Sequence, residues 1–263
     1  MSRAHASPPH VATLIVLGLA LPATAWAADP RFSLAVGAEY TTGDYGGDQA
    51  VEETYVPVTA VLDIERVSLR LTVPYLSVRA PELTYLDGPD GQPIVGEGPI
   101  VTNDGIGDVQ AVVTVYNVLS SGDGGSALDL TGKIKFGTAD VDAGLGTGEQ
   151  DYSAQADMFR FFSRFTAMGT LGYSLRGDPE GYDLNDTFYA SLGGSYKATD
   201  RVQFGGFFDF REASIQGTDD IQELSGWIAT QVGDRGRVDF YVLTGFGDSS
   251  PDWGAGMSYR ASF

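Results

Sequence analysis

From Arg31 to Phe263 the sequence alternates apolar and polar residues with a period of two, in successive blocks. Short turns and longer polar loops alternate between the blocks. Residues two apart on a strand share a face, so each block predicts a strand with one apolar and one polar face. Blocks of roughly ten residues with this turn pattern are typical of transmembrane barrels, which close because lipid cannot satisfy a sheet edge. We therefore predict an all-β fold, a transmembrane antiparallel up-and-down β-barrel.

Twelve blocks can be counted, an even number, which places both chain ends on the periplasmic side. The count falls to ten if the first or tenth block is misread, because Ala80–Gly105 and Ala213–Gln222 are ambiguous. The first of these segments is long enough to fold inward as a constriction, and its acidic residues Glu82, Asp87, Asp90 and Glu97 are expected to line the mouth. The expected strands are Arg31–Tyr40, Thr54–Ile64, Val67–Arg79, Gly107–Leu119, Ala127–Phe136, Tyr152–Phe162, Phe165–Arg176, Asp186–Lys197, Arg201–Glu212, Glu223–Val232, Arg237–Phe246 and Trp253–Phe263.

Residues 1–27 are predicted to be a cleavable export signal. Arg3 gives a positive start, Val11–Leu21 is apolar, and Ala25–Ala27 has the small-x-small spacing of a signal-peptidase site. A membrane anchor is the alternative, but the apolar run has about 11 residues and a spanning helix needs roughly 20. Residues 28–263 are then one barrel domain in the cell outer membrane.

Composition removes several classes of function. The chain has no cysteine, which excludes thiol chemistry and a lipoprotein anchor. Both histidines, His5 and His10, lie in the predicted signal, so the mature chain has no histidine base for serine hydrolysis and no zinc-ligand cluster. The net charge of -19 disfavours nucleic acid as a partner. We expect no catalytic residue, cofactor or metal, although a carboxylate-only enzyme stays formally open.

The chain ends on the pattern of a bacterial outer-membrane strand, with Tyr259, Ala261 and the terminal Phe263 on one face. The barrel-assembly machinery is the partner expected to read this end. Aromatic residues near strand ends on the outward phase predict the girdles found at both membrane interfaces. They are Tyr40, Tyr75, Tyr152, Tyr173, Tyr196, Trp253 and Tyr259.

Four short motifs follow one another in the middle of the chain: Gly105-Ile106-Gly107-Asp108, Gly132-Lys133-Ile134-Lys135, Gly144-Leu145-Gly146-Thr147-Gly148 and Asp151-Tyr152. On these motifs, the region from Gly105 to Phe263 resembles a family of outer-membrane transporters linked to the meta pathway of phenol degradation. Gly137 and Ala139 replace the family's usual proline and glycine. The resemblance implies a transport role and leaves the subfamily and the solute open.

Charged residues of both signs fall on the inward phase. They indicate either a hydrated, selective pore or a salt-bridge network that fills the lumen. About eight strands leave an interior filled by side chains and sixteen or more leave a channel, so twelve admits a small ligand or a narrow path. Inward aromatic residues add stacking surface or only pack the interior. The predicted lumen residues are Asp108, Lys133, Lys135, Asp157, Arg176, Phe207, Asp209, Arg211, Glu223 and Trp227.

These features favour a channel for passive diffusion of small compounds, aromatic or hydrophobic ones among the candidates, through a narrow charged lumen. The alternative is a structural or adhesion barrel that transports nothing and acts through its acidic extracellular loops. Outer-membrane lipid, lipopolysaccharide and a small solute are the expected partners.

Overall fold

The computed structural model describes residues 5–6, 19–20, 30–87, 91–122 and 125–263. This part of the chain forms a closed antiparallel barrel of 12 strands, as the sequence predicts. Its described residues include no helix that could span a membrane. Of the predicted export signal, only β1 (His5–Ala6) and β2 (Leu19–Ala20) are described, and they pair with each other. The remainder of that prediction lies outside the described residues.

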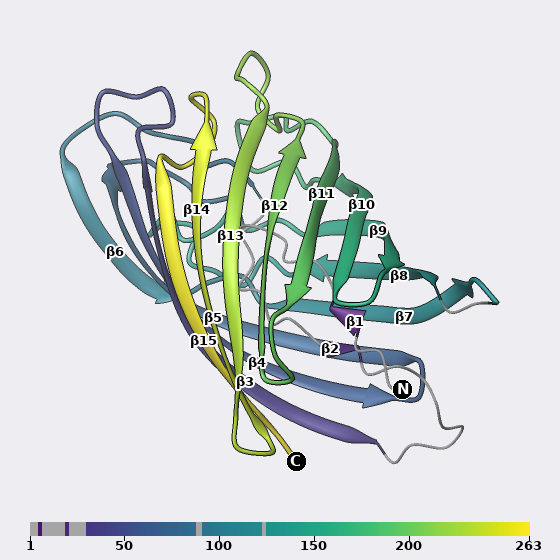
Figure 1. Cartoon of the computed structure of the whole chain (residues 1–263). Coiled ribbons are helices and arrows are strands. Elements are labelled where there is room, and N and C mark those ends of the chain that lie inside the picture. The colour runs from purple at the N-terminus through teal and green to yellow at the C-terminus, as the bar shows by residue number, and fades with distance from the viewer. Residues whose placement is uncertain (1–4, 7–18, 21–29, 88–90, 123–124) are drawn as a thin grey trace.

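Strands that follow one another in sequence pair with each other, except that β6 and β7 both pair with β5, and β15 pairs with β3 to close the barrel (Figure 1). The closing pairs include Ala255 with Tyr40 and Tyr259 with Val36. The wall consists of β3 (Arg31–Gly43), β4 (Val51–Ile64), β5 (Val67–Pro81), β6 (Ile100–Ile106), β7 (Gln110–Ser120), β8 (Ser126–Lys135), β9 (Asp151–Phe161), β10 (Phe165–Leu175), β11 (Thr187–Lys197), β12 (Val202–Arg211), β13 (Ile221–Val232), β14 (Gly236–Phe246) and β15 (Trp253–Ser262).

The expected fourth strand is too short, because β6 and β7 together occupy that position in the wall. Both pair with β5: Tyr75 lies opposite Ile106, whereas Thr72 lies opposite Gln110. Residues 107–109 therefore face only residues 73–74, which is a bulge. Pro74 has no N–H to donate, but its carbonyl accepts from Gly107 N–H at 3.0 Å. The segment expected as a loop from Ala80 to Gly105 thus contains a strand.

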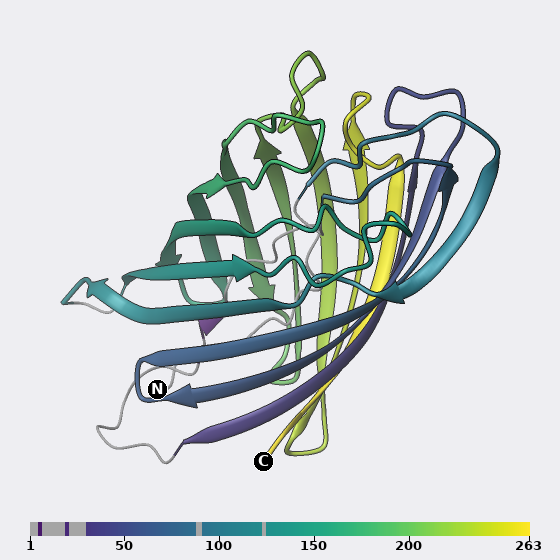
Figure 2. The same ribbon diagram turned by 180° about the vertical axis from the view of Figure 1, so that it is seen from behind.

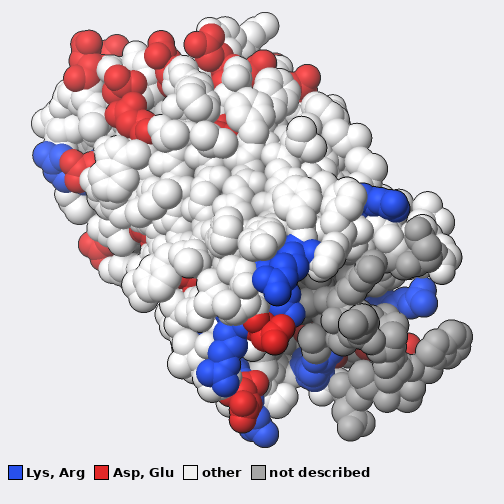
Figure 3. Space-filling view, in the orientation of Figure 1, with Lys and Arg blue, Asp and Glu red and all other residues white. Residues whose placement is uncertain are grey.

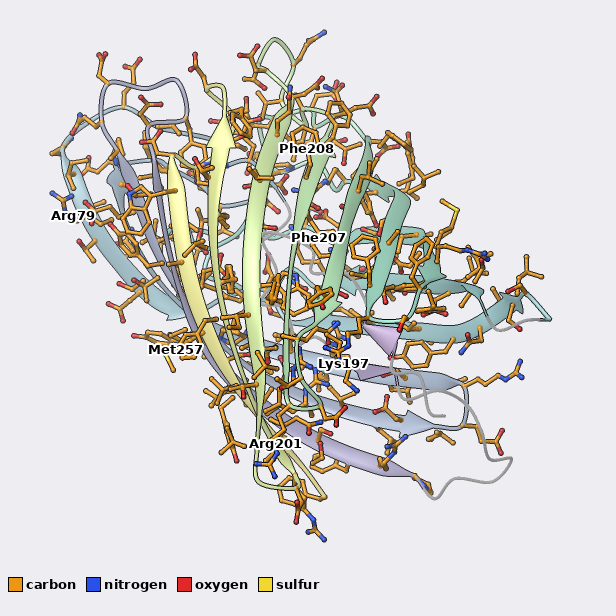
Figure 4. The ribbon with its side chains drawn as sticks, viewed as in Figure 1. Arg79, Lys197, Arg201, Phe207, Phe208 and Met257 are labelled. Atoms are coloured by element: carbon orange, nitrogen blue, oxygen red, sulfur yellow. The ribbon has the colours of Figure 1, made fainter. Side chains whose placement is uncertain are left out.

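The outer surface is a belt of apolar side chains. Phe207 and Phe208 are neighbours on β12, yet they are 1% and 42% exposed because they point to opposite faces (Figure 4). In space-filling view an uncharged band separates acidic side chains at one end from basic side chains at the other (Figure 3). The seven aromatic residues predicted for the girdles are at least partly exposed on this outer face. A band of this kind is suited to the hydrocarbon core of a membrane.

The two ends of the barrel differ in their connections. Turns as short as Glu65-Arg66 join strands at one end, and the long loops gather at the other (Figures 1 and 2). Arg31 and the C-terminal Phe263 lie at the short-turn end, where Phe263 N–H donates to Phe32 O at 2.8 Å. Short turns are periplasmic in this class of fold, so the acidic, long-loop end faces outward.

Replacing Phe263 with Ala is expected to weaken the seam between β15 and β3. The Phe263 and Phe32 ring centroids are 6.1 Å apart, and such pairs contribute roughly 0.5–1.5 kcal/mol. We expect the free energy of unfolding in lipid vesicles to fall by about 1 kcal/mol. Phe263→Trp keeps an aromatic ring at the seam and should retain most of the stability. Equal stabilities of the Ala variant and the parent protein would contradict this role.

Candidate functional site

The inner face of the barrel carries the residues that the alternation places inward. Six of the ten predicted lumen residues are buried and the other four are partly buried. The buried six are Asp108, Lys135, Asp157, Phe207, Glu223 and Trp227, and the partly buried four are Lys133, Arg176, Asp209 and Arg211. The structure thus groups them around one lumen, while their contact with a solute stays a prediction.

A buried ion-pair network lies at the long-loop end of the lumen. Lys135 Nζ is 3.0 Å from Asp151 Oδ2, 3.6 Å from Asp87 Oδ1 and 3.7 Å from Asp108 Oδ2. Arg176 Nη1 is 3.2 Å from the same Asp151 oxygen and 3.3 Å from Asp87 Oδ2. None of these side chains is more than 5% exposed. Two cations and three carboxylates therefore compensate one another in a nearly dry part of the lumen.

This network holds the long segment between β5 and β6 inside the barrel mouth. Asp87 belongs to that segment, and the preceding Leu86 N–H donates to Gly144 O at 3.1 Å. Leu86 and Leu145 join a buried apolar cluster with residues of β3, β4 and β5, including Tyr55. Burial raises the pKa of Asp87, and the neighbouring Arg176 guanidinium and Lys135 ammonium oppose that rise. The segment folds inward, so the mouth is partly filled.

Of the four acidic residues expected to line the mouth, Asp87 joins the network, while Glu82 and Glu97 are exposed to solvent. That the four residues line the mouth stays a prediction. Asp90 lies outside the described residues. The alternation of strands carries no information about which side chains of a long loop turn inward.

Aromatic and apolar side chains form a buried cluster on the inner face of the barrel. It includes Phe159, Phe161, Met168, Phe207 and Trp227. The rings of Phe159 and Phe161 are nearly parallel, with centroids 6.1 Å apart and an interplanar angle of 4°. A further charged pair faces the lumen from β14, where Arg237 Nε donates to Asp239 Oδ1 at 2.8 Å.

Four inward aromatic residues lie directly across the strand pair from a glycine, a feature that the sequence analysis missed. A Cβ added to Gly193 would come within 2.3 Å of the Phe207 ring, and one added to Gly256 within 2.4 Å of the Tyr241 ring. The rings therefore lie flat over the glycines and present a face to the lumen. The pairs are Gly193 with Phe207, Gly205 with Trp227, Gly172 with Tyr189 and Gly256 with Tyr241.

The guanidinium group of Arg211, on β12, lies beside an aromatic ring of the inner face. Its guanidinium carbon is 6.0 Å from the Tyr189 ring centroid, and Tyr189 OH donates to Gln155 Oε1 at 3.0 Å. Asp209, two residues before it on β12, accepts a short hydrogen bond from Ser191 and lies opposite Glu223 in the register. Charge of both signs and an aromatic face thus meet within one region of the wall.

A cavity of about 50 Å³ lies between the inward segment and the barrel wall. It is lined by Glu39, Glu53, Tyr55 and Glu223 from the wall and by Leu86 from the segment. On this measure one water molecule needs roughly 10–15 Å³, so the cavity has room for a few water molecules or a small polar group.

The described residues contain no group of His, Cys, Asp or Glu side chains arranged to hold a metal ion. Charged and aromatic side chains line the lumen, and the inward segment partly fills its mouth.

No family model matches this chain, and no curated protein matches it significantly. Solved structures do match. A crystal structure of an outer membrane channel from Pseudomonas putida F1 aligns over 91% of this chain and 97% of its own, with a TM-score of 0.69 and 12% identity. The NanC porin aligns over 87% and 98%, with a TM-score of 0.56 and 8% identity. The KdgM porin aligns over 87% and 99%, with a TM-score of 0.53 and 6% identity.

These likenesses establish the fold class. Together with the apolar belt and the closed barrel, they identify the chain as an outer-membrane β-barrel located in the cell outer membrane. At these identities they say nothing about the solute. Membership in the phenol-degradation family stays a prediction from the motifs.

Proposed function

We propose that the protein is an outer-membrane channel through which small compounds diffuse passively. The observation that carries the proposal is the lumen itself, where charges of both signs and flat aromatic faces line the interior. Lys133, Asp209 and Arg211 add charge of both signs to the lumen outside the network that anchors the inward segment, which supports a selective path for solutes. The ten inward residues predicted from the sequence form the proposed solute path.

Small aromatic and hydrophobic compounds are the proposed solutes. The Tyr189 ring provides a stacking face beside Arg211, and the rings of Phe207 and Trp227 add aromatic surface on the same inner face of the barrel. Ligand sites combine such apolar surface with a few placed polar groups. The motif resemblance to the phenol-degradation family supports the same solutes, while the fold shared with channels and porins supports only the channel role.

Two partners complete the proposal. Assembly machinery is expected to recognise the C-terminal strand that ends at Phe263. Lipopolysaccharide is expected to contact the acidic long-loop end, through divalent cations that bridge its phosphates to carboxylates (Figure 3).

A structural or adhesion barrel is the second candidate. The inward segment that fills the mouth and the acidic outer end favour it, because both are compatible with a surface that binds a partner and passes nothing.

Single-channel conductance separates the two candidates. The refolded mature protein is placed in a planar bilayer, and small aromatic solutes are added. Discrete conductance steps that an aromatic solute interrupts are expected for the channel. A correctly folded barrel that stays silent would overturn the channel proposal and favour the structural one.

A further inference from the structure

The cavity beneath the inward segment has an unusual balance of charge. Three glutamates line it, Glu39 from β3, Glu53 from β4 and Glu223 from β13, and Arg211 is the cation among its lining residues. Asp87 also reaches it, but that carboxylate is already paired with Arg176 and Lys135. The wall of the cavity is therefore short of positive charge.

The acidic wall is built by strand register. Glu39 lies opposite Tyr55 on one side and opposite Gly256 on the other. Gly256 in turn lies opposite Tyr241, whose ring covers the glycine. One row across four strands thus sets Glu39 between two tyrosines. The loop residue Tyr45 closes the cavity from above, and burial and the carboxylate of Glu53 raise the pKa of its hydroxyl.

Three polar atoms of this row are left without a hydrogen-bond partner among the described residues. They are Glu39 Oε2, the Tyr55 hydroxyl and the Tyr241 hydroxyl, on side chains that are 7%, 2% and 7% exposed, and Glu39 and Tyr55 line the cavity. Buried polar atoms are normally hydrogen-bonded, so exceptions of this kind need an explanation. The two unpartnered oxygens that line the cavity can both accept, and beside a surplus of carboxylates they indicate a ligand that donates hydrogen bonds and carries positive charge.

We propose that this cavity binds the primary ammonium group of a small amine. An ammonium group has three donors and no acceptor, which matches Glu39 Oε2, the Tyr55 hydroxyl and a further carboxylate of the wall. The tyrosine rings add the faces over which a cation is attracted. The cavity of about 50 Å³ admits such a head group but not a large solute.

The geometry distinguishes an ammonium group from other ligands. A metal ion requires several carboxylates converging on one point, and the described residues hold no such group. An anion would meet three glutamates at close range. The inference deepens the proposed function, because it gives a channel for small compounds an entry site for cationic ones, but binding at this site does not require ion flow.

The test measures binding to the refolded protein in detergent micelles by calorimetry, with benzylamine as the probe. Benzyl alcohol has the same ring without the charge, and benzoate reverses the charge. We expect benzylamine to bind at least tenfold more tightly than either, and Glu39→Gln to weaken its binding about tenfold, which corresponds to roughly 1.4 kcal/mol. Tyr55→Phe removes only the hydroxyl and should weaken binding by a smaller factor. Glu97→Gln alters an exposed loop carboxylate and serves as the matched control.

Equal binding of benzylamine and benzyl alcohol, or unchanged binding after both Glu39→Gln and Tyr55→Phe, would overturn the site. If Glu39→Gln fails to fold, benzylamine binding to Tyr55→Phe tests the site alone, and unchanged binding to that variant would overturn it. A barrel that binds benzylamine but conducts no ions would leave the ammonium site standing and overturn the channel. A barrel that conducts ions but binds benzylamine no more tightly than benzyl alcohol would support the channel and overturn the ammonium site.

Discussion

Replacing Asp87 with Asn is expected to raise the single-channel conductance several-fold. The Asp87 carboxylate lies 3.3 Å from Arg176 and 3.6 Å from Lys135, and these ion pairs connect the inward segment to the barrel wall. The Asn side chain cannot form these ion pairs, so the segment loses its charged anchor. Both cations keep Asp151, so their charge stays compensated and the wall stays intact. The mouth should then open more of the time.

Conductance in a planar bilayer measures this opening, and cleavage of the segment by an added protease gives a readout that needs no ion flow. Asp239→Asn is the matched control, because Asp239 faces the same lumen from β14 and its buried ion pair is with Arg237 of the same strand rather than with the inward segment. We expect the control to keep the parent conductance. A similar increase in both variants would mean that lumen charge, rather than the anchor, sets the conductance. An unchanged Asp87→Asn variant would show that the segment does not restrict flow.

The faces of single strands can be predicted from sequence because each strand of this barrel separates lipid from lumen. Every second residue meets hydrocarbon, so apolar and polar residues alternate strictly enough to be read without a structure. The exception is β6 (Ile100–Ile106). It follows a segment rich in proline and glycine. Because of the bulge between β6 and β7, the alternation of inward and outward side chains in β6 is one residue out of step with that in β7. A one-residue shift moves every later side chain to the other face, which hides the strand from a pattern search.

The composition of the lumen can be predicted in the same way, but its pairing cannot. Alternation places Lys135 and Asp108 inward, yet nothing local indicates that Asp87 reaches Lys135 from a loop 48 positions earlier in the chain. The same holds for the row of Glu39, Tyr55 and Tyr241, which depends on the register of β3 with its two neighbours. Register between distant strands comes from the closed barrel as a whole. Contacts between side chains on different strands therefore cannot be predicted from the alternation within one strand, and they require the structure of the whole barrel.

Val242→Arg is expected to lower the free energy of unfolding by roughly 2–4 kcal/mol, because arginine on the lipid face is most costly near the membrane midplane. Val242 lies near the middle of β14, points outward and is 61% exposed. The measurement is denaturant unfolding of the protein in lipid vesicles, followed by tryptophan fluorescence. The prediction tests the membrane depth of the apolar belt directly.

Val232 provides the matched control, since it is also an outward valine, is 50% exposed and ends β13 beside the turn to β14. At the interface the arginine side chain can reach water, so Val232→Arg is expected to cost only about 0–1 kcal/mol. Equal losses in the two variants would mean that the belt does not sit in hydrocarbon as the structure implies. A large loss at Val232 alone would instead shift the membrane toward the short-turn end. The difference between the two valines therefore locates the bilayer on the barrel, independently of whether the lumen conducts.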